Sequence, residues 1–490
     1  MNSDKDSFHK MALLTGARIF GILFSIFIPM YLGRKLSVPV YGTYKQIMLV
    51  FWFAQVALNL GVDDSAYFYL RKNPKHFPQY SFNALVFNLM ATGLLWALMV
   101  VFKNPIGILV KNEGLIEYIP LTGMLLLLTV SSMQIEGILI GLNRFRERLI
   151  LEMGMELLKS TAIVLSFLIF NSIRAVLISL SILMFIRLLY TFYVINVYKI
   201  KNQLSYVNGL PYLKEQLKFG LPLGISRVLQ NLLNIENFFI SSYFSLIQFT
   251  YYTIGCFENP LINAARTSLF ELVNIDLIDA QKDTDHKKSL NVWKRMNRKL
   301  FLIVLPFVIY MMFFAKEIIT FIFSAKYLES VPFFILFNIY ILMSCLNPEP
   351  LFRATLKTQF VLKLRILGLL LGALFIFGGA YWGGALMALG GKTTALFITN
   401  TLGLYIGAKL IESNIIDLFD WNELLKITTI SIALSLPLKA ITSYLNWHPF
   451  FILSLTFSLF FIFLLSITWK WAIIKEDEKD LLKSYLNKIF

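Results

Sequence analysis

The chain has 490 residues, of which 57% are hydrophobic and only 15% charged, and its formal net charge is +16. About a quarter of the residues of a soluble domain are charged, so this composition excludes an ordinary soluble protein. The basic residues lie in short segments between apolar blocks, which is typical of cytoplasmic membrane loops and argues against nucleic acid as a partner.

The apolar blocks are roughly 20 residues long, the length that a helix needs to cross a bilayer. They predict an all-α transmembrane bundle of about fourteen spans, without a folded domain outside the membrane. The predicted spans are Met11–Gly33, Thr43–Gly61, Tyr80–Phe102, Glu117–Leu142, Leu149–Asn171, Ile173–Val197, Glu215–Ser242, Leu246–Leu272, Lys299–Ser324, Val331–Phe352, Val361–Tyr381, Gly383–Lys409, Glu423–Tyr444 and Pro449–Ile474. The longest connection, Val273–Arg298, is predicted to be a loop.

The distribution of Lys and Arg predicts the orientation of these spans. Most of these residues lie near the two termini and in the even-numbered loops, for example Arg144, Arg146 and Arg148 after the fourth span. Since basic loops stay on the cytosolic side, both termini are predicted to be cytosolic. An even number of spans follows, so twelve fits as well as fourteen.

Two short segments near the first hairpin resemble a known transporter signature. Leu32–Leu36 (LGRKL), followed by Tyr41–Tyr44 (YGTY), resembles the signature of polysaccharide and O-antigen flippases. These flippases belong to the multidrug/oligosaccharidyl-lipid/polysaccharide exporter superfamily. Three later segments are similar to the same family, namely Leu58–Val62, Gly141–Phe145 and Lys218–Leu223.

The resemblance implies a V-shaped bundle with two six-helix lobes that works by alternating access. Its lobes would be residues 1–198 and 199–410, with two additional helices in 411–490. A weak echo between Tyr31–Tyr44 and Tyr243–Tyr252 agrees with two repeats. The implied substrate is an undecaprenyl-pyrophosphate-linked oligosaccharide, moved from the cytosolic to the outer leaflet of the bacterial inner membrane. Polysaccharide polymerase machinery is an implied partner.

Ionisable residues inside the spans are candidates for function, because a charge in mid-bilayer costs roughly 2.5–3.5 kcal/mol on insertion scales. The basic ones are Arg18, Lys159, Arg187, Arg227, Arg266 and Lys392, and the acidic ones are Glu136, Glu156, Glu236 and Glu258. The surplus of basic residues predicts a water-filled cavity that admits an anion.

Two neighbouring spans each present a stripe of two amides and one arginine, spaced i, i+4, i+7. The stripes are Arg227, Asn231 and Asn234 in the seventh span and Asn259, Asn263 and Arg266 in the eighth. Such side chains suit sugar hydroxyls and a pyrophosphate, because a guanidinium can grip phosphate oxygens with two hydrogen bonds. The alternative is a structural role, in which the polar groups bond neighbouring helices to each other. By position, the resemblance implies that Arg18 and Arg266 match cavity arginines of lipid II flippases.

The other ionisable residues receive different predictions. Arg187 could line the cavity or act as a counter-ion, and Lys392 is a further substrate-binding candidate. Glu236 and Glu258 are candidates for coupling transport to an ion, because they lie in the same spans as Arg227 and Arg266. In the fifth span, Glu152, Glu156 and Lys159 share one face, which favours neutralisation within the helix.

No catalytic constellation is predicted. Gly390–Thr393 lacks the first glycine of a phosphate-binding loop, since residue 386 is leucine, and the four histidines are scattered. Asp63 and Asp64 would suit a lipid-linked glycosyltransferase, but they lie in a loop predicted to be cytosolic. Neither an enzyme nor a cofactor or metal is therefore predicted. The other alternative is a multidrug exporter of the same superfamily, whose cationic substrates a basic cavity would repel.

The predicted orientation can be tested by cysteine labelling. A cysteine in place of Lys111 should react with a membrane-impermeant reagent from outside. A cysteine in place of Lys288 should react only with reagents that reach the cytosol. Protection of position 111 together with outside labelling of position 288 would show that the orientation is inverted.

Overall fold

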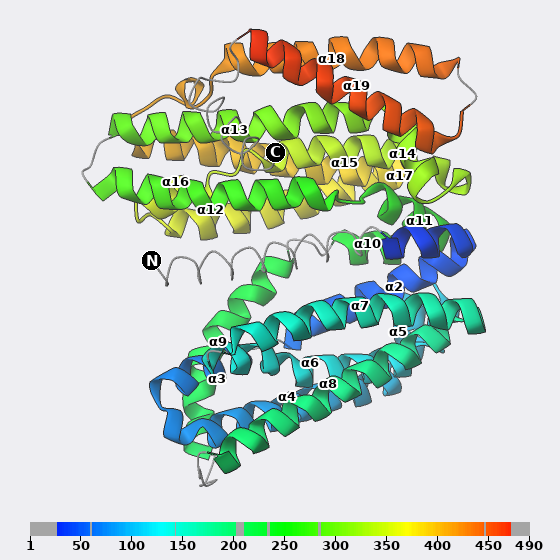
Figure 1. The fold of residues 1–490 in the computed structure, drawn as a ribbon, viewed down its shortest axis with the longest axis vertical. Coiled ribbons are helices and arrows are strands. Elements are labelled where there is room, and N and C mark those ends of the chain that lie inside the picture. The colour runs from blue at the N-terminus through cyan, green and yellow to red at the C-terminus, as the bar shows by residue number, and fades with distance from the viewer. Residues whose placement is uncertain are drawn as a thin grey trace. The chain divides into compact units, whose positions relative to one another are not determined.

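The computed structural model describes residues 27–58, 61–142, 144–201, 210–232, 236–282, 286–444 and 447–471. Every regular element in these ranges is a helix (Figure 1). The chain forms two compact units, Met1–Thr250 and Tyr251–Phe490, called unit 1 and unit 2 below.

The long helix α6 lies at the centre of unit 1, where it contacts α2, α3, α4, α7 and α8. Its inner face contributes Ile135 and Leu139, which pack with Phe77 and Val194 in a buried apolar cluster. The α-helices of unit 1 are α2 (Val38–Leu58), α3 (Val62–Lys72), α4 (Phe77–Val101), α5 (Lys103–Leu109), α6 (Ile119–Gly141), α7 (Phe145–Phe170), α8 (Ile173–Lys201), α9 (Leu210–Leu232), α10 (Glu236–Tyr243) and the start of α11 (Leu246–Gly255). Two short 3-10 helices, η1 (Pro74–His76) and η2 (Glu113–Leu115), lie between them.

Unit 2 is arranged around α13, which contacts α12, α14, α15 and α18. Its α-helices after α11 are α12 (Pro260–Lys282), α13 (His286–Phe313), α14 (Ala315–Ile322), α15 (Val331–Ser344), α16 (Glu349–Ala354), α17 (Gln359–Leu410), α18 (Trp421–Ser443) and α19 (Pro449–Lys470). The 3-10 helices η3 (Ala325–Ser330) and η4 (Ile416–Leu418) complete the unit.

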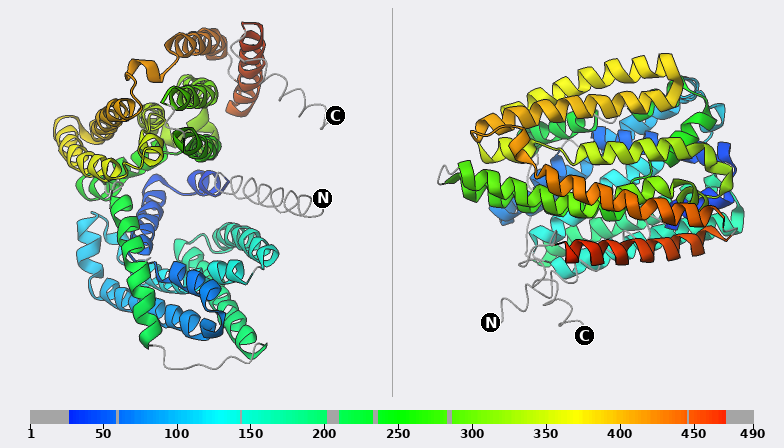
Figure 2. Two further views of the ribbon diagram at one scale, coloured as in Figure 1. Left: turned by 90° about the vertical axis from the view of Figure 1, so that its left-hand side faces the viewer. Right: turned by 90° about the horizontal axis from the view of Figure 1, so that it is seen from above.

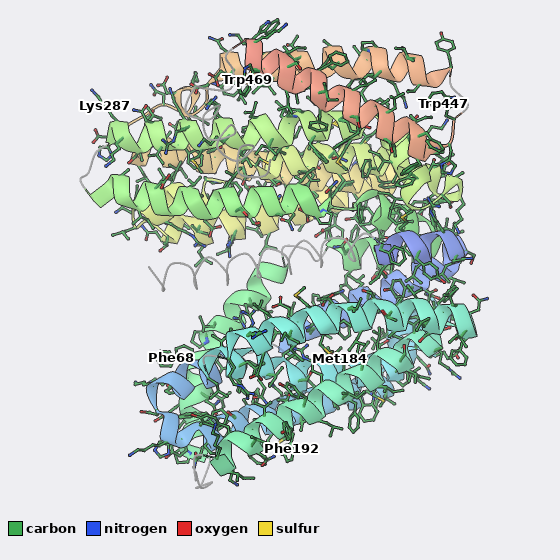
Figure 3. The ribbon with its side chains drawn as sticks, in the orientation of Figure 1. Phe68, Met184, Phe192, Lys287, Trp447 and Trp469 are labelled. Carbon is green, nitrogen blue, oxygen red and sulfur yellow. The ribbon has the colours of Figure 1, made fainter. Side chains whose placement is uncertain are left out.

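The outer surfaces of the helices are apolar, as a hydrocarbon environment requires. On α8, Met184 is buried whereas Phe192 is 49% exposed, and Trp447 and Trp469 are also exposed in unit 2 (Figure 3). Among the described residues, nine helices are long and apolar enough to span a bilayer. The protein is therefore a multi-pass membrane protein, while the finer count of fourteen spans stays a prediction.

One of these nine, α17, contains two predicted spans joined by a glycine pair. Gly383 and Gly384 leave the helical conformation, and Gly384 has a φ of 76°, which favours glycine. The two arms fold back on each other (Figure 2). A Cβ at Gly391 would lie only 2.1 Å from the carbonyl oxygen of Phe375 on the opposite arm. Close backbone packing therefore explains Gly391, one of the two glycines in the segment that was compared with a phosphate-binding loop.

Several predicted spans are interrupted. The ninth divides into α13 and α14 at Phe314, which has non-helical angles. In the seventh, the residues between α9 and α10 lie outside the described ranges. The eighth divides at 256–259, where Pro260 begins α12, and the tenth divides before the prolines Pro348 and Pro350. Proline lacks the N–H that would continue the helical ladder, so both breaks have a local cause.

The predicted loop Val273–Arg298 is wrong. Helix α12 continues to Lys282 and α13 already begins at His286. This segment is polar, but its buried side chains Leu277, Ala280 and Trp293 show that it packs as amphipathic helix.

The predicted lobe boundaries at residues 198 and 410 stay predictions. Helix α9, which the sequence assigned to the second lobe, packs against α2, α3 and α4 in unit 1. The contact is close at Gly61, where a Cβ would lie 2.3 Å from the carbonyl oxygen of Gly220. Leu58–Val62 and Lys218–Leu223, two segments that resemble the flippase family, therefore contact each other at Gly61 and Gly220.

Replacing Gly391 by alanine should separate the two arms of α17. The added Cβ meets backbone that cannot rotate away, and overpacking of this kind costs about 1–3 kcal/mol. We expect a lower thermal unfolding midpoint of the purified protein in detergent, measured by tryptophan fluorescence. Gly372→Ala is the matched control, because a Cβ there has nothing within 4 Å and alanine favours helix. An unchanged midpoint for Gly391→Ala would contradict the close packing.

Candidate functional site

Arg266 is the centre of a polar cluster within unit 2, called the Arg266 cluster below. Its guanidinium donates hydrogen bonds to the carboxylate of Glu258 at 3.0 Å, the amide oxygen of Asn263 at 3.2 Å, and the hydroxyl of Ser344. The Arg266 side chain is 20% exposed. Three acceptors therefore fix the guanidinium while leaving part of it accessible.

The break between α11 and α12 creates this cluster. Helix α11 ends at Gly255, where a Cβ would lie 2.2 Å from the Cβ of Phe333, so the chain must turn close to α15. The non-helical residues 256–259 then bring Glu258 back beside Arg266, eight residues later. Pro260, which lacks a backbone N–H, begins α12 directly after this break.

Ser344 is the member of the cluster that the sequence analysis missed. It is the last residue of α15, and its hydroxyl donates a 2.6 Å hydrogen bond to the carbonyl of Ile341. The hydroxyl oxygen is therefore left to accept from Arg266. No spacing in the sequence signals this contact, because the two residues are far apart in the chain.

The other candidates of unit 2 lie near other partners. Asn259 contacts the sulfur of Met311 at 4.0 Å, although it shares the predicted stripe with Asn263 and Arg266. The Nζ of Lys392 lies 4.6 Å from the ring centroid of Tyr340, a cation–π contact. The structure thus confirms proximity for Asn263 and Arg266, and it gives Asn259 and Lys392 different surroundings.

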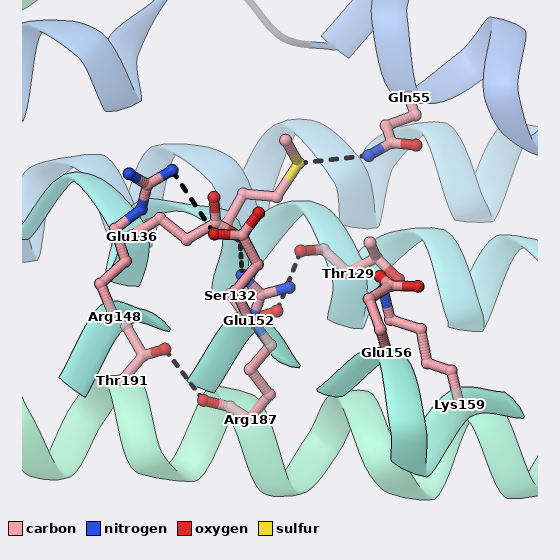
Figure 4. Close-up of polar contacts among 11 residues, drawn as sticks. Gln55, Thr129, Ser132, Glu136, Arg148, Glu152, Glu156, Lys159, Arg187 and Thr191 are labelled. Carbon is pink, nitrogen blue, oxygen red and sulfur yellow. Dashed lines mark hydrogen bonds and ion pairs between the residues drawn. The ribbon is translucent and has the colours of Figure 1, made fainter. Parts of the chain in front are cut away.

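Arg187 lies in unit 1 and is only 7% exposed. One guanidinium nitrogen contacts a carboxylate oxygen of Glu136 at 2.6 Å, so the residue joins α8 to α6 (Figure 4). Of the two roles left open for Arg187, the counter-ion role fits this geometry better. The prediction for α7 is confirmed, since Lys159 pairs with Glu156 at 2.7 Å within the helix.

The remaining predicted site residues are less closely defined. Arg227 is partly exposed on α9, and Glu236 begins α10, where it is 4% exposed. Arg18 and Asn234 lie outside the described residues, and the side chain of Asn231 does too.

The structure adds a buried polar network that the sequence did not indicate. Asn112 donates to Gln46 at 2.7 Å and to Thr43 at 3.0 Å, while Gln46 donates to Ser241 at 3.0 Å. The network joins the signature-bearing start of α2 to α10. Nearby, a Cβ at Gly42 would lie 2.1 Å from the hydroxyl of Thr250. The first hairpin, which contains Gly42, therefore contacts the similar segment that contains Thr250, within unit 1.

The described residues contain no group of three or more His, Cys, Asp or Glu that could hold a metal ion. Asp63, considered above for a glycosyltransferase, accepts a 2.8 Å hydrogen bond from the buried Asn88. This contact ties α3 to α4 and gives Asp63 a structural role.

Known proteins share both the sequence pattern and the fold. A family profile described as "Polysaccharide biosynthesis protein" matches residues 31–332. A search of curated proteins finds no match.

Among solved structures, "Lipid II flippase MurJ, inward closed conformation" is similar with a TM-score of 0.71 and 14% identity, covering 94% of this chain and 99% of that one. An inward-facing multidrug resistance MATE family transporter of the MOP superfamily has a TM-score of 0.61 and 12% identity, covering 80% and 94%. A point mutant of the Vibrio cholerae MATE transporter VcmN has a TM-score of 0.51 and 14% identity, covering 84% and 98%.

These similarities confirm the resemblance that the signature segments predicted. The helices that carry the Arg266 cluster thus belong to a fold that is shared with transporters. Since the profile covers more than half of the chain, the protein belongs to the polysaccharide biosynthesis protein family.

Proposed function

We propose that the protein is a flippase for lipid-linked oligosaccharides. It would move undecaprenyl-pyrophosphate-linked glycan from the cytosolic to the outer leaflet of a bacterial inner membrane, by alternating access. Family membership supports a role in polysaccharide assembly, and the fold is shared with a lipid II flippase. The observation that carries the proposal is the Arg266 cluster, a fixed and partly exposed guanidinium within apolar helices.

The chemistry of this cluster suits a pyrophosphate. A guanidinium stays charged inside a protein and offers two parallel hydrogen bonds to phosphate oxygens. Arg266 is held in place before any ligand arrives, so less side-chain entropy is lost on binding. Asn263 and Glu258 accept hydrogen bonds from the same guanidinium and keep it in place. Arg227 and Lys392 are proposed as additional binding residues, whereas the ion pair with Glu136 explains Arg187 without a ligand.

A multidrug exporter is the second candidate, because MATE transporters share the fold. Their name implies export of drugs, and a cationic substrate would meet Arg266 and Lys392 in unit 2. Like charges within a low-dielectric site repel strongly, so these residues disfavour cationic cargo. The family profile also favours the glycan substrate.

Arg266→Ala should cut flipping of the lipid-linked glycan tenfold or more. A lost hydrogen bond to a charged group is worth about 1.5–3 kcal/mol, and about 1.4 kcal/mol corresponds to a factor of ten. Arg266→Lys should recover part of the rate, because a point charge replaces the planar fork. The measurement is polysaccharide export by cells that carry the variant, at equal protein abundance in the membrane.

Arg353→Ala is the matched control for this experiment. Arg353 also pairs with a carboxylate, that of Glu349, but its side chain is 55% exposed at a helix end. Export should be normal in this variant. Normal export by Arg266→Ala would remove Arg266 from the substrate site.

Ion coupling through Glu236 or Glu258 is a separate proposal. Glu258 is held 3.0 Å from Arg266, so a proton or cation that neutralises Glu258 would also remove the counter-charge of the guanidinium. We expect that Glu236→Gln and Glu258→Gln fold, and that at least one slows flipping in proteoliposomes under an imposed proton or sodium gradient.

Equal rates for both variants and the wild type, with and without the gradients, would exclude coupling through these two acids. Transport driven by the membrane potential would then be the better explanation. Outward movement of a negative charge gains about 2.3 kcal/mol per charge per 100 mV.

A further inference from the structure

Helix α7 has two exposed faces of opposite character. Ile150, Leu158 and Leu165 are each at least 50% exposed on one face. Glu152 and Glu156 are also exposed, with values of 47% and 44% for their side chains. At about 100° per residue, the two carboxylates lie roughly opposite the three apolar residues.

These two faces require different surroundings. The apolar face suits hydrocarbon, whereas an exposed carboxylate within a span costs several kcal/mol unless it meets water or a polar ligand. Residues 146–170 form one of the candidate spans, and both carboxylates lie within it. The charged face of α7 therefore borders an aqueous space.

Neighbouring helices extend this face into a larger surface, called the charged wall below. Its members are Arg148, Glu152, Glu156 and Lys159 of α7, Glu136 of α6 and Arg187 of α8. Figure 4 shows how these side chains gather between the three helices. The wall has three acidic and three basic groups, so its formal charge is zero.

The acids and bases of the wall differ in exposure. Each base pairs with one acid, at 3.8 Å for Arg148 and Glu152, 2.7 Å for Lys159 and Glu156, and 2.6 Å for Arg187 and Glu136. The acid side chains are 41–47% exposed, whereas the bases are 7–32% exposed. A carboxylate has about four lone-pair positions and one partner uses only part of them. The wall therefore presents spare acceptors to the aqueous space.

Two buried polar atoms also lie at its edge. The Nε of Arg148 makes no hydrogen bond to any described residue, and neither does the Oε1 of Gln55 on α2. The amide of Gln55 is held in place by the sulfur of Met133, at 3.3 Å. The groups that the wall exposes for hydrogen bonding are therefore its carboxylates and, to a smaller extent, its bases.

We propose that the charged wall binds the sugar hydroxyls of the transported glycan, an assignment that rests on the proposed function. A sugar hydroxyl both donates and accepts, so it can bond a carboxylate and a neighbouring base together. A phosphate would meet three exposed carboxylates on a surface without net positive charge. A free cation would have to displace bases that already pair with each acid. An uncharged, hydroxyl-rich ligand fits these groups best.

The proposal can be tested with two lipids that differ only in the sugar. The purified protein in detergent is titrated with undecaprenyl pyrophosphate and with undecaprenyl-pyrophosphoryl-galactose, and both Kd values are measured by microscale thermophoresis. Wild type should bind the galactosyl lipid at least tenfold more tightly. The double variant Glu152→Gln, Glu156→Gln should lose this preference and bind the sugar-free lipid equally well or better, because the wall becomes positive.

Glu147→Gln is the matched control. Glu147 lies in the first turn of α7 and forms a 2.5 Å ion pair with Arg144, the residue that precedes the helix, outside the wall. This variant should keep the sugar preference. Binding of the sugar-free lipid shows that a variant is folded; if the double variant binds neither lipid, each single variant is compared in the same way.

The outcomes separate this proposal from the proposed function. A double variant, or both single variants, that keep the full sugar preference would overturn the charged wall as the sugar site. Equal binding of both lipids by wild type would overturn it as well, while leaving a pyrophosphate-dependent flippase intact. Failure of wild type to bind either lipid would contradict the proposed function itself.

Discussion

A charge that enters a hydrocarbon layer needs an opposite charge or water, and the described helices are arranged accordingly. Lys439 on α18 contacts both carboxylate oxygens of Glu317 on α14, at 2.6 and 2.7 Å. Arg187 and Glu136 join α8 to α6 in the same way. Removing one partner from such a pair leaves an uncompensated charge, which costs about 3–5 kcal/mol. The ion pairs therefore help to determine which helices can be neighbours, and the more exposed charges indicate where water reaches.

The sequence predicted the positions of most long helices because blocks of apolar residues report directly on contact with hydrocarbon. It predicted fewer of their interruptions, since one non-helical residue such as Phe314 does not change the hydropathy of its surroundings. Polar contacts within one helix, such as Glu156 with Lys159, follow from spacing alone. Contacts between helices do not: Arg266 with Ser344 depends on how α12 and α15 pack. Three of the four residues of the Arg266 cluster were therefore candidates from the sequence, and Ser344 was not.

The signature segments have a physical meaning that motif comparison alone does not give. Gly42 and Gly61 permit contacts with Thr250 and Gly220 that a Cβ would block. In each contact, a segment from the start of the chain meets one about 160–210 residues later, within unit 1. Gly61 also has a φ of 75°, so glycine is favoured there for its backbone as well. These two positions therefore constrain the packing of unit 1.

The glycine turn of α17 also affects how the chain enters the membrane. Only Gly383 and Gly384 separate the two arms, so no polar loop is available to hold one arm in place while the next is synthesised. An exposed backbone in hydrocarbon costs several kcal/mol per unsatisfied group, whereas a closed helical pair satisfies its own hydrogen bonds. Residues 359–410 therefore form a helical pair in which each arm depends on the other rather than on a polar loop for its place in the bilayer.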